Sequence, residues 1–137
     1  MKRVLPIIIG ISILMFSASS VFGQMTAQDH YKRAEDYFKQ GRYNEAIAPL
    51  KEAIRIKPNY ADAHYNLGAM YAEGKGVLQD YALAHMWFNL SGPDGSKVSV
   101  RNRNRLEKLM NPSQIEKAQR LAREWLESHK NGEFNGI

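Results

Sequence analysis

The sequence contains no cysteine, and this absence removes several kinds of site at once. Disulfide bridges, thiolate metal sites and a lipid-modified cysteine are all excluded. Long apolar runs are lacking too. The longest, Val4 to Phe16, counts thirteen residues and contains Pro6, whereas a membrane-spanning helix needs about 20 apolar residues. This run is therefore short for a membrane anchor.

The N-terminal residues nevertheless have the three-part order of a secretory signal. Lys2 and Arg3 precede the apolar run, and Ser17 to Gly23 turns small and polar. We expect a signal peptide over residues 1–23 with cleavage after Gly23. The product would be periplasmic or secreted and would have no membrane span. The alternative is an uncleaved membrane anchor.

The 114 residues that follow the expected cut, 137 minus 23, are enough for one domain. They carry 17 Lys and Arg against 14 Asp and Glu, a net charge of +3. This mildly basic balance does not indicate a nucleic-acid partner, and export disfavours one further.

Shifting the chain against itself by 34 residues aligns identical residues at the period of a helix–turn–helix repeat. One such unit cannot bury its apolar face alone, so neighbouring units stack. We therefore predict an all-α fold of stacked helix pairs. The matched residues are Ala27 with Ala61, His30 with His64, Tyr31 with Tyr65 and Tyr37 with Tyr71.

Capping residues mark two helix starts. Thr26 precedes Asp29 and Asn59 precedes Asp62, which places a capping oxygen ahead of an acid on the first turn. The predicted starts are Ala27 and Ala61.

Glycines mark where these two helices end, because glycine tolerates positive φ. Gly41 follows the first helix, and the stretch Gly74-Lys75-Gly76 follows the other. Second helices are predicted from about Asn44 and Asp80.

The spacing of these residues resembles a known repeat family. Residues 27–60 resemble one tetratricopeptide unit, and residues 61–94 resemble the Sel-one-like variant, whose loop is longer. The resemblance implies a short right-handed α–α superhelix, a solenoid of about three helix pairs. The tetratricopeptide positions are Ala34, Tyr37, Gly41, Tyr43, Ala46, Ala53 and Pro58. The Sel-one-like positions are Leu67, Gly68, Tyr71, Gly74, Gly76, Val77, Asp80, Ala84 and Trp87.

Beyond Ser91 the repeat pattern fades, although helical patterns continue. Residues 92–95 read as a turn. Residues 96–129 resemble a degenerate end unit that closes such a stack, and residues 130–137 are expected to form a flexible tail.

This end unit is predicted to contain two helices. The first runs from about Ser96 to Met110, and the second starts at Asn111-Pro112, where Gln114 answers the cap. The residues predicted to be buried are Val98, Leu106, Leu109, Met110, Ile115, Ala118, Leu121, Ala122, Trp125 and Leu126.

Catalytic motifs are absent. The sequence has no serine elbow, phosphate-binding glycine loop or zinc-protease motif, so we predict a protein that is not an enzyme and has no cofactor. His30 and His64 share a repeat position and suggest a metal pair, but no third ligand is indicated. The favoured reading is that both pack. Trp87, Phe88 and Trp125 are predicted to be core residues.

The resemblance implies a ligand-binding inner face made by the first helix of each unit. Its predicted residues are Tyr31, Glu35, Phe38, Tyr65, Asn66 and Glu73, together with Lys39 and Ala69. The tetratricopeptide clamp for a terminal carboxylate is only partly present. Asn66 matches its asparagine, but Tyr31 and Glu35 stand where the clamp has lysine and asparagine. The alternative is that Tyr31 and Tyr65 only pack between repeats.

A second candidate surface is a basic stripe on the helix predicted from Ser96. Its residues are Lys97, Arg101, Arg105 and Lys108, whose spacings of four, four and three keep them on one side. Such a stripe suits an acidic protein segment or an anionic membrane. The alternative is a solvated face that keeps the protein soluble.

These patterns favour a non-catalytic protein–protein interaction module or adaptor of the bacterial envelope, binding a protein or peptide of unknown identity. The alternative is a hydrolytic or enzyme-accessory role at the cell wall, as suggested for some cysteine-rich Sel-one-like proteins. Self-association through the open edge of the solenoid is a further possibility.

Overall fold

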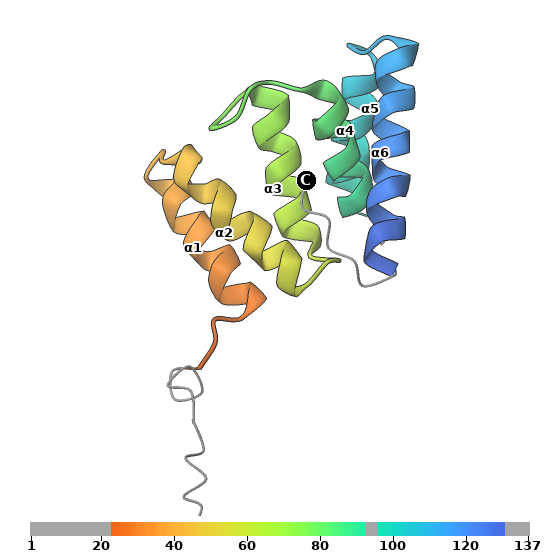
Figure 1. Cartoon of the computed structure of the whole chain (residues 1–137). Coiled ribbons are helices and arrows are strands. Elements are labelled where there is room, and N and C mark those ends of the chain that lie inside the picture. Colours follow the sequence, from red (N-terminus) through yellow and green to blue (C-terminus); the bar gives the residue numbers. More distant parts are fainter. Residues whose placement is uncertain (1–22, 93–95, 131–137) are drawn as a thin grey trace, which may run out of the picture.

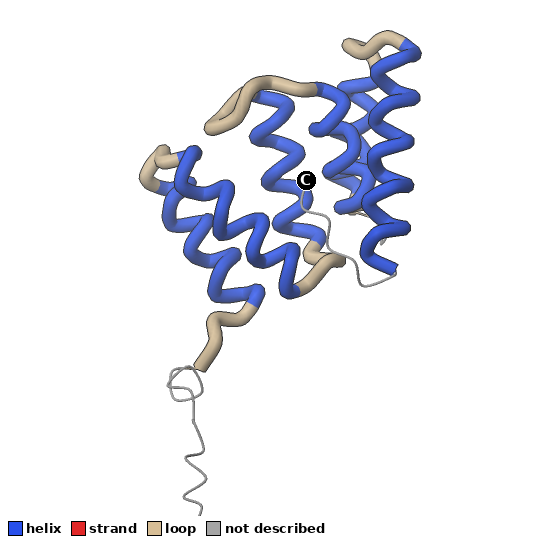
Figure 2. The backbone as a smooth tube through the Cα atoms, viewed as in Figure 1, coloured by secondary structure: helices blue, strands red, loops and turns tan. Residues whose placement is uncertain are grey.

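The computed structural model describes residues 23–92 and 96–130, and in these ranges the chain forms six α-helices and no strand. Figures 1 and 2 show the helices stacked side by side as a short solenoid, which confirms the predicted all-α repeat fold. Three predictions lie almost entirely outside the described residues: the signal peptide over 1–23, the turn at 92–95 and the tail over 130–137, of which residues 1–22, 93–95 and 131–137 are not described. The helices are α1 (Ala27–Lys39), α2 (Tyr43–Ile56), α3 (Ala61–Glu73), α4 (Tyr81–Ser91), α5 (Lys97–Glu107) and α6 (Pro112–Lys130).

The helices associate in two hairpins and a three-helix group. α1 packs on α2, and α3 packs on α4, while α2 contacts α3 and so joins the two hairpins. The last two helices depart from a simple third hairpin, because α5 and α6 both pack chiefly on α4 (Figure 1). α4 is therefore the central element of the C-terminal half.

Reciprocal side-chain caps start two of the helices, as predicted. The side chain of Thr26 accepts a hydrogen bond from the backbone N–H of Asp29. The carboxylate of Asp29 in turn accepts one from the backbone N–H of Thr26. Asn111 and Gln114 exchange the same pair of bonds at 2.9 Å each. Each pair satisfies two backbone N–H groups that a helix start otherwise leaves free.

The predicted cap at Asn59 is wrong. The N-cap of α3 is Tyr60, and no side chain caps this helix. Tyr60 is instead 7% exposed, with its ring stacked on Tyr31 at a centroid distance of 5.1 Å. A cap at Asn59 would start α3 at Tyr60. The buried Tyr60 is itself the N-cap, so the helix starts at Ala61.

Glycines adopt positive φ where predicted: +69° at Gly41, +66° at Gly74 and +70° at Gly76. Gly76 also lies against the start of α2, where a Cβ atom would stand 2.7 Å from the backbone carbon of Tyr43. The loop between α3 and α4 therefore reaches back to the first hairpin.

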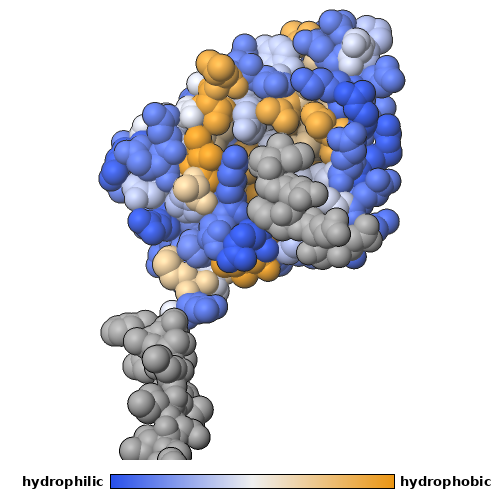
Figure 3. Space-filling view, viewed as in Figure 1, coloured by the Kyte–Doolittle hydropathy of each residue, from blue (hydrophilic) through white to orange (hydrophobic). Residues whose placement is uncertain are grey.

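The core runs through both hairpins and into α6. Trp87, Phe88 and Trp125 are 4%, 3% and 7% exposed, which confirms the prediction that they are core residues. Gly68 lets α3 approach α4, because a Cβ there would lie 2.8 Å from the ring of Phe88. In the view of Figure 3 the surface is mostly hydrophilic, with a hydrophobic band near α3. No helix in the described ranges combines the length and the apolar composition needed to cross a membrane.

Three residues predicted to be buried are exposed: Val98 by 47%, Leu109 by 63% and Leu126 by 46%. Leu126 lies on α6, whose buried residues are Ala118, Ala122 and Trp125. For Val98 and Leu109 the reason lies in how α5 packs on α4. Its buried residues are Ser99 and Leu106, and this choice of face turns Val98 outward. Leu109 follows the end of the helix, in the turn before α6.

Candidate protein-binding face

The first helices of the three units can be compared by counting from their N-caps, which are Thr26, Tyr60 and Ser96. The successive caps are 34 and 36 residues apart. The fifth residues after the caps are Tyr31, Tyr65 and Arg101, and the sixth residues are Lys32, Asn66 and Asn102.

A tyrosine–asparagine hydrogen bond recurs at both junctions between these helices. Asn66 Nδ2 on α3 donates to the hydroxyl of Tyr31 on α1 at 3.2 Å. Asn102 Nδ2 on α5 donates to the hydroxyl of Tyr65 on α3 at 3.4 Å, which is long for such a bond and therefore weaker. These four residues are called the Tyr–Asn ladder below.

Each tyrosine of the ladder also packs against an aromatic ring. Tyr31 stacks on Tyr60, and Tyr65 lies 5.6 Å from Phe88. Both ladder tyrosines are half-buried. Each tyrosine therefore packs on a neighbouring ring, Tyr65 within its own unit, and remains partly exposed. A ligand could contact both rings with little ordering cost, because packing already restricts them.

The surroundings of Tyr31 keep its hydroxyl protonated. Burial raises the pKa of Tyr31, and the nearby carboxylates of Glu35 and Asp62 raise it further, while the Asn66 bond acts in the opposite direction. The hydroxyl thus accepts from Asn66 and retains a proton of its own to donate to a ligand.

The other predicted site residues lie apart from the ladder. Phe38 packs on Tyr43 of α2, with ring centroids 5.9 Å apart. Glu73 is exposed at the end of α3 and pairs with Lys75 in the following loop. Glu35 is half-buried beside Tyr31. The structure therefore brings together Tyr31, Glu35, Tyr65 and Asn66, but not Phe38 and Glu73.

The basic stripe extends this inner face. Lys97, Arg101, Arg105 and Lys108 are all exposed on α5 or at its end, and none forms an ion pair with another described residue. Arg101 occupies the position that Tyr31 and Tyr65 hold in the earlier units. The two candidate surfaces are thus continuous.

Asn102 is the ladder residue that sequence reasoning missed. The spacing from the second to the third unit is 36 residues, so a 34-residue shift does not align it with Asn66. A 36-residue shift would have found it, because that shift aligns Asn102 with Asn66.

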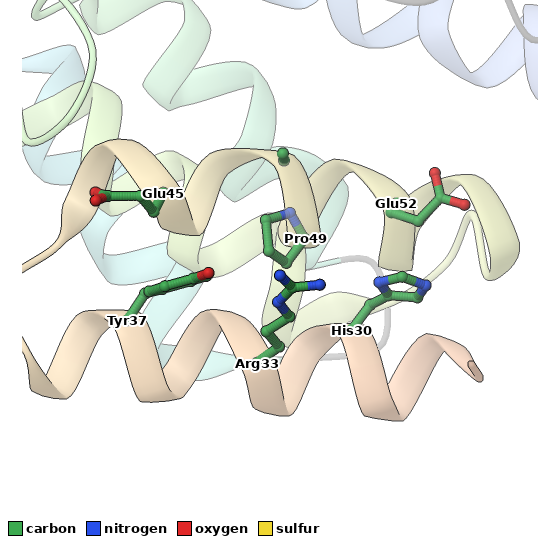
Figure 4. Close-up of a pocket in the computed structure, with 7 residues that line it drawn as sticks. His30, Arg33, Tyr37, Glu45, Pro49 and Glu52 are labelled. Atoms are coloured by element: carbon green, nitrogen blue, oxygen red, sulfur yellow. The ribbon is translucent and has the colours of Figure 1, made fainter.

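His30 and His64 share a repeat position but have different surroundings. His30 lines a groove of about 440 Å³ between α1 and α2, with Arg33, Pro49 and Glu52 (Figure 4). His64 is 1% exposed, enclosed in the core. Within residues 23–92 and 96–130, no three His, Asp or Glu side chains gather in a metal-binding arrangement.

Two tryptophans enclose His64. The rings of Trp87 on α4 and Trp125 on α6 lie 5.4 and 5.1 Å from its ring. Burial lowers its pKa from 6.5 to about 4, although the nearby backbone of Leu90 and Pro58 opposes the shift. Neither ring nitrogen makes a hydrogen bond of normal geometry to a described residue. His64 is therefore a neutral packing residue at pH 7, as the favoured reading of the sequence held.

Two family models match the chain: the TPR repeat over residues 34–74 and the Sel1 repeat over residues 61–92. No solved structure gives a significant match.

Three curated proteins are similar over part of their length. The chain is 35% identical over 52 residues to the Hsp70-Hsp90 organising protein of Plasmodium falciparum, covering 38% of this chain and 9% of that one. It is 36% identical over 56 residues to the tetratricopeptide repeat and J domain-containing co-chaperone DNJ1 of Cryptococcus neoformans, covering 40% and 11%. It is 34% identical over 70 residues to a Helicobacter pylori protein named "Putative beta-lactamase HcpD", covering 51% and 22%.

The matched stretches thus span no more than 22% of any of these relatives. The two repeat models overlap over residues 61–74, which build α3. Residues 34 to 92 of this chain therefore form tetratricopeptide and Sel1-like repeats.

Proposed function

We propose that this protein is a non-catalytic binding module of the bacterial envelope whose protein or peptide ligand lies along the inner face of α1, α3 and α5. The observation that carries the proposal is the Tyr–Asn ladder, which joins the first helices of the three units into one partly exposed polar and aromatic surface. Aromatic and amide side chains held in place by their neighbours are suited to anchoring an extended segment. Two of the similar proteins are named as an organising protein and a co-chaperone, which fits a binding role.

Affinity capture from a periplasmic extract, with the parent protein and Tyr65→Ala as paired baits, tests the ligand face. Loss of the half-buried Tyr65 ring should weaken binding by about 2 kcal/mol, or about thirtyfold. Lys51→Ala, at an exposed position on α2, is the matched control and should capture the same proteins as the parent. Equal capture by Tyr65→Ala, with its helix content intact by circular dichroism, would remove the ladder from the binding site.

Export is the second part of the proposal. It is supported by the charged start, the short apolar run and the small residues before Gln24. Mass spectrometry of the protein recovered from cells should then find Gln24, or a close neighbour, as the first residue. Recovery of intact Met1 from a membrane fraction would show an uncleaved anchor instead.

A hydrolytic role is the second candidate, favoured only by the name of HcpD. Two buried serines cannot supply a nucleophile for it. Ser91 and Ser99 are 2% and 0% exposed and are hydrogen-bonded to each other at 2.8 Å, and Ser91 donates to the carbonyl of Ala61. Neither hydroxyl can reach a substrate. Turnover of a chromogenic β-lactam by the purified protein, abolished by a single substitution, would establish the hydrolytic role and displace the binding proposal.

A further inference from the structure

The exposed side of α5 carries two aliphatic side chains with two arginines between them. Val98, Arg101 and Arg105 are three and four residues apart, so they lie on one side of the helix, and Leu109 follows in the turn at its end. Val98 and Leu109 are 47% and 63% exposed. These four residues are called the α5 stripe. The aliphatic side chains at its two ends, Val98 and Leu109, are thus exposed although side chains of this kind are usually buried.

Charge is unevenly distributed along the chain, and the excess lies in the last two helices. Residues 96–130 contain nine Lys and Arg against four Asp and Glu, a net charge of +5. Residues 23–92 contain eight of each, a net charge of zero. The field around α5 therefore attracts acidic partners, and the first two units do not counter it.

The arginines of the stripe are available for a partner. Glu107, the one acid of α5, lies 2.7 Å from His85 of α4. Arg103, which faces α4, donates to Asn89. Arg101 and Arg105 form no ion pair with any residue of the described ranges, and both guanidinium groups are exposed. Each can therefore hold a carboxylate with two parallel hydrogen bonds.

We propose that the α5 stripe binds an acidic amphipathic helix of a partner protein, with two carboxylates against Arg101 and Arg105 and an aliphatic side chain against each of Val98 and Leu109. The inference rests on the proposed function in one respect, that the chain is a protein-binding module. The two arginines are four residues apart, and acids four residues apart on a facing helix lie at the same distance of about 6 Å. Eleven residues separate Val98 from Leu109, so a partner helix of about three turns spans the stripe.

The composition of the stripe favours a protein partner over an anionic membrane. A helix that lies in a membrane surface needs a broad apolar face beneath its basic residues. On α5, Leu106 is buried against the core, which leaves Val98 as the exposed large aliphatic side chain within the helix and Leu109 just beyond it. Two separated aliphatic side chains suit the ends of a short helix–helix contact.

The test uses a fluorescein-labelled, helix-forming peptide of about 14 residues with two glutamates four residues apart and a leucine beyond each of them. Fluorescence anisotropy should show binding that weakens between about 50 mM and about 300 mM salt, because the contact is partly electrostatic. The same peptide with lysine in place of glutamate should not bind. Failure of the glutamate peptide to bind would overturn the proposal.

Two double variants separate the contributions. Arg101→Glu with Arg105→Glu should weaken binding at least about tenfold, since both carboxylate partners are lost and replaced by repulsion. Val98→Ser with Leu109→Ser should weaken it about threefold to tenfold. The matched control for the arginine pair is Lys51→Glu with Arg123→Glu, which changes the net charge equally at exposed positions of α2 and α6. The control for the aliphatic pair is Leu78→Ser, which alters a 91% exposed leucine of the α3–α4 loop. Both controls should bind within about twofold of the parent.

The outcomes distinguish this proposal from the ligand face. If Tyr65→Ala loses its captured partner while the stripe variants bind the peptide like the parent, the inner-face assignment stands and the α5 stripe is refuted. If only the stripe variants lose the peptide, the stripe is confirmed whatever the fate of the ladder. Binding to vesicles containing about one third phosphatidylglycerol, lost in Arg101→Glu with Arg105→Glu while the acidic peptide does not bind, would overturn the proposal in favour of a membrane surface.

Discussion

At the scale of single residues, one repeat position acquires different roles in different units. His30 and His64 occupy the fourth place after their N-caps, yet His30 borders an open groove and His64 lies between two tryptophans. The cause is what covers each unit. α6 places Trp125 over the second unit, whereas His30 lies at the N-terminal edge of the described stack, in a groove between α1 and α2.

Burial of His64 predicts a loss of stability in mild acid. Its folded-state pKa of about 4 lies below its ordinary value of 6.5, so between these pH values the unfolded chain binds a proton that the folded chain does not. Stability should therefore fall as pH falls through this window, by about 2 kcal/mol at pH 5. Above pH 6.5 the effect is absent.

Chemical denaturation of the parent and His64→Leu at pH 7 and pH 5 measures this loss. The leucine variant cannot take up the proton, so its stability should change less between the two pH values. Asp29, Glu45 and Glu52 have pKa values lowered by their hydrogen bonds, and their effect on stability is common to parent and variant. An equal pH dependence in parent and variant would contradict the assignment to His64.

The residue scale also shows which parts of the site the sequence could predict. Tyr31 and Tyr65 were found because a 34-residue shift aligns them, and Asn66 was found because the family resemblance implies an inner face that includes it. Asn102 was missed because the third spacing is 36 residues. Val98 and Leu109 were expected to be buried because periodicity identifies an apolar side but not the neighbour that covers it.

At the scale of elements, α5 differs from its neighbours in how it is held. It buries two side chains, Ser99 and Leu106, whereas α4 buries eight. Polar contacts supply much of its attachment. They are Ser91 with Ser99 at 2.8 Å, His85 with Glu107 at 2.7 Å, Asn89 with Arg103 at 3.0 Å and Tyr65 with Asn102 at 3.4 Å.

This attachment predicts that α5 opens before α3 and α4. Elements with few buried apolar contacts exchange their amide hydrogens through local opening. Hydrogen–deuterium exchange followed by mass spectrometry should show lower protection in α5 than in α3 and α4. Equal protection in the three helices would show that polar contacts hold α5 as firmly as the core holds the others.

Trp87 should contribute a large share of the free energy that holds α3, α4 and α6 together. It is 4% exposed and lies 6.3 Å from Trp125 and 5.4 Å from His64. Trp87→Ala loses both the transfer free energy of the ring and the packing around it, a cost of about 3 to 5 kcal/mol. Thermal melting should show a clear drop, while Leu78→Ala, at a 91% exposed position, should melt like the parent. An unchanged melting temperature for Trp87→Ala would mean that the ring is not part of the core in solution.

Most element boundaries follow from local chemistry, and the sequence therefore predicted them well. The helices start within one residue of the predicted positions because caps, glycines and prolines act within one turn. The arrangement of the last two helices does not follow from local chemistry. Whether α6 pairs with α5 or lies on α4 depends on the contact of Trp125 with Trp87, which no pattern within either helix encodes.

At the scale of the whole molecule, the two junctions between units are built differently. At the junction between the second and third units, α5 and α6 both pack on α4. The first rests on α2 against α3, the Tyr31–Tyr60 stack, and the α3–α4 loop where Gly76 meets Tyr43. In a repeat array, how cooperatively the units unfold depends on the strength of the contacts between neighbouring units. The first hairpin should therefore be the unit that separates most readily.

Gly76 and Gly41 provide a matched pair that tests this junction. Their φ angles are +70° and +69°, so alanine incurs the same backbone strain at either position. Around Gly41 no atom lies within 4 Å of an added Cβ, whereas at Gly76 the Cβ would stand 2.7 Å from the backbone of Tyr43, which no side-chain rotation can relieve. Gly41→Ala should therefore cost about 1 kcal/mol, and Gly76→Ala about 1 to 3 kcal/mol more, because the loop must lift from α2.

Denaturant unfolding gives the two free energies, and hydrogen exchange locates the effect. For Gly76→Ala, protection should fall in α1 and α2 and persist in α4 and α6. Equal costs for the two variants would mean that the loop yields without disturbing the hairpin, and the junction would then depend on its other contacts, among them the tyrosine stack, the Asn66–Tyr31 hydrogen bond and the α2–α3 contact.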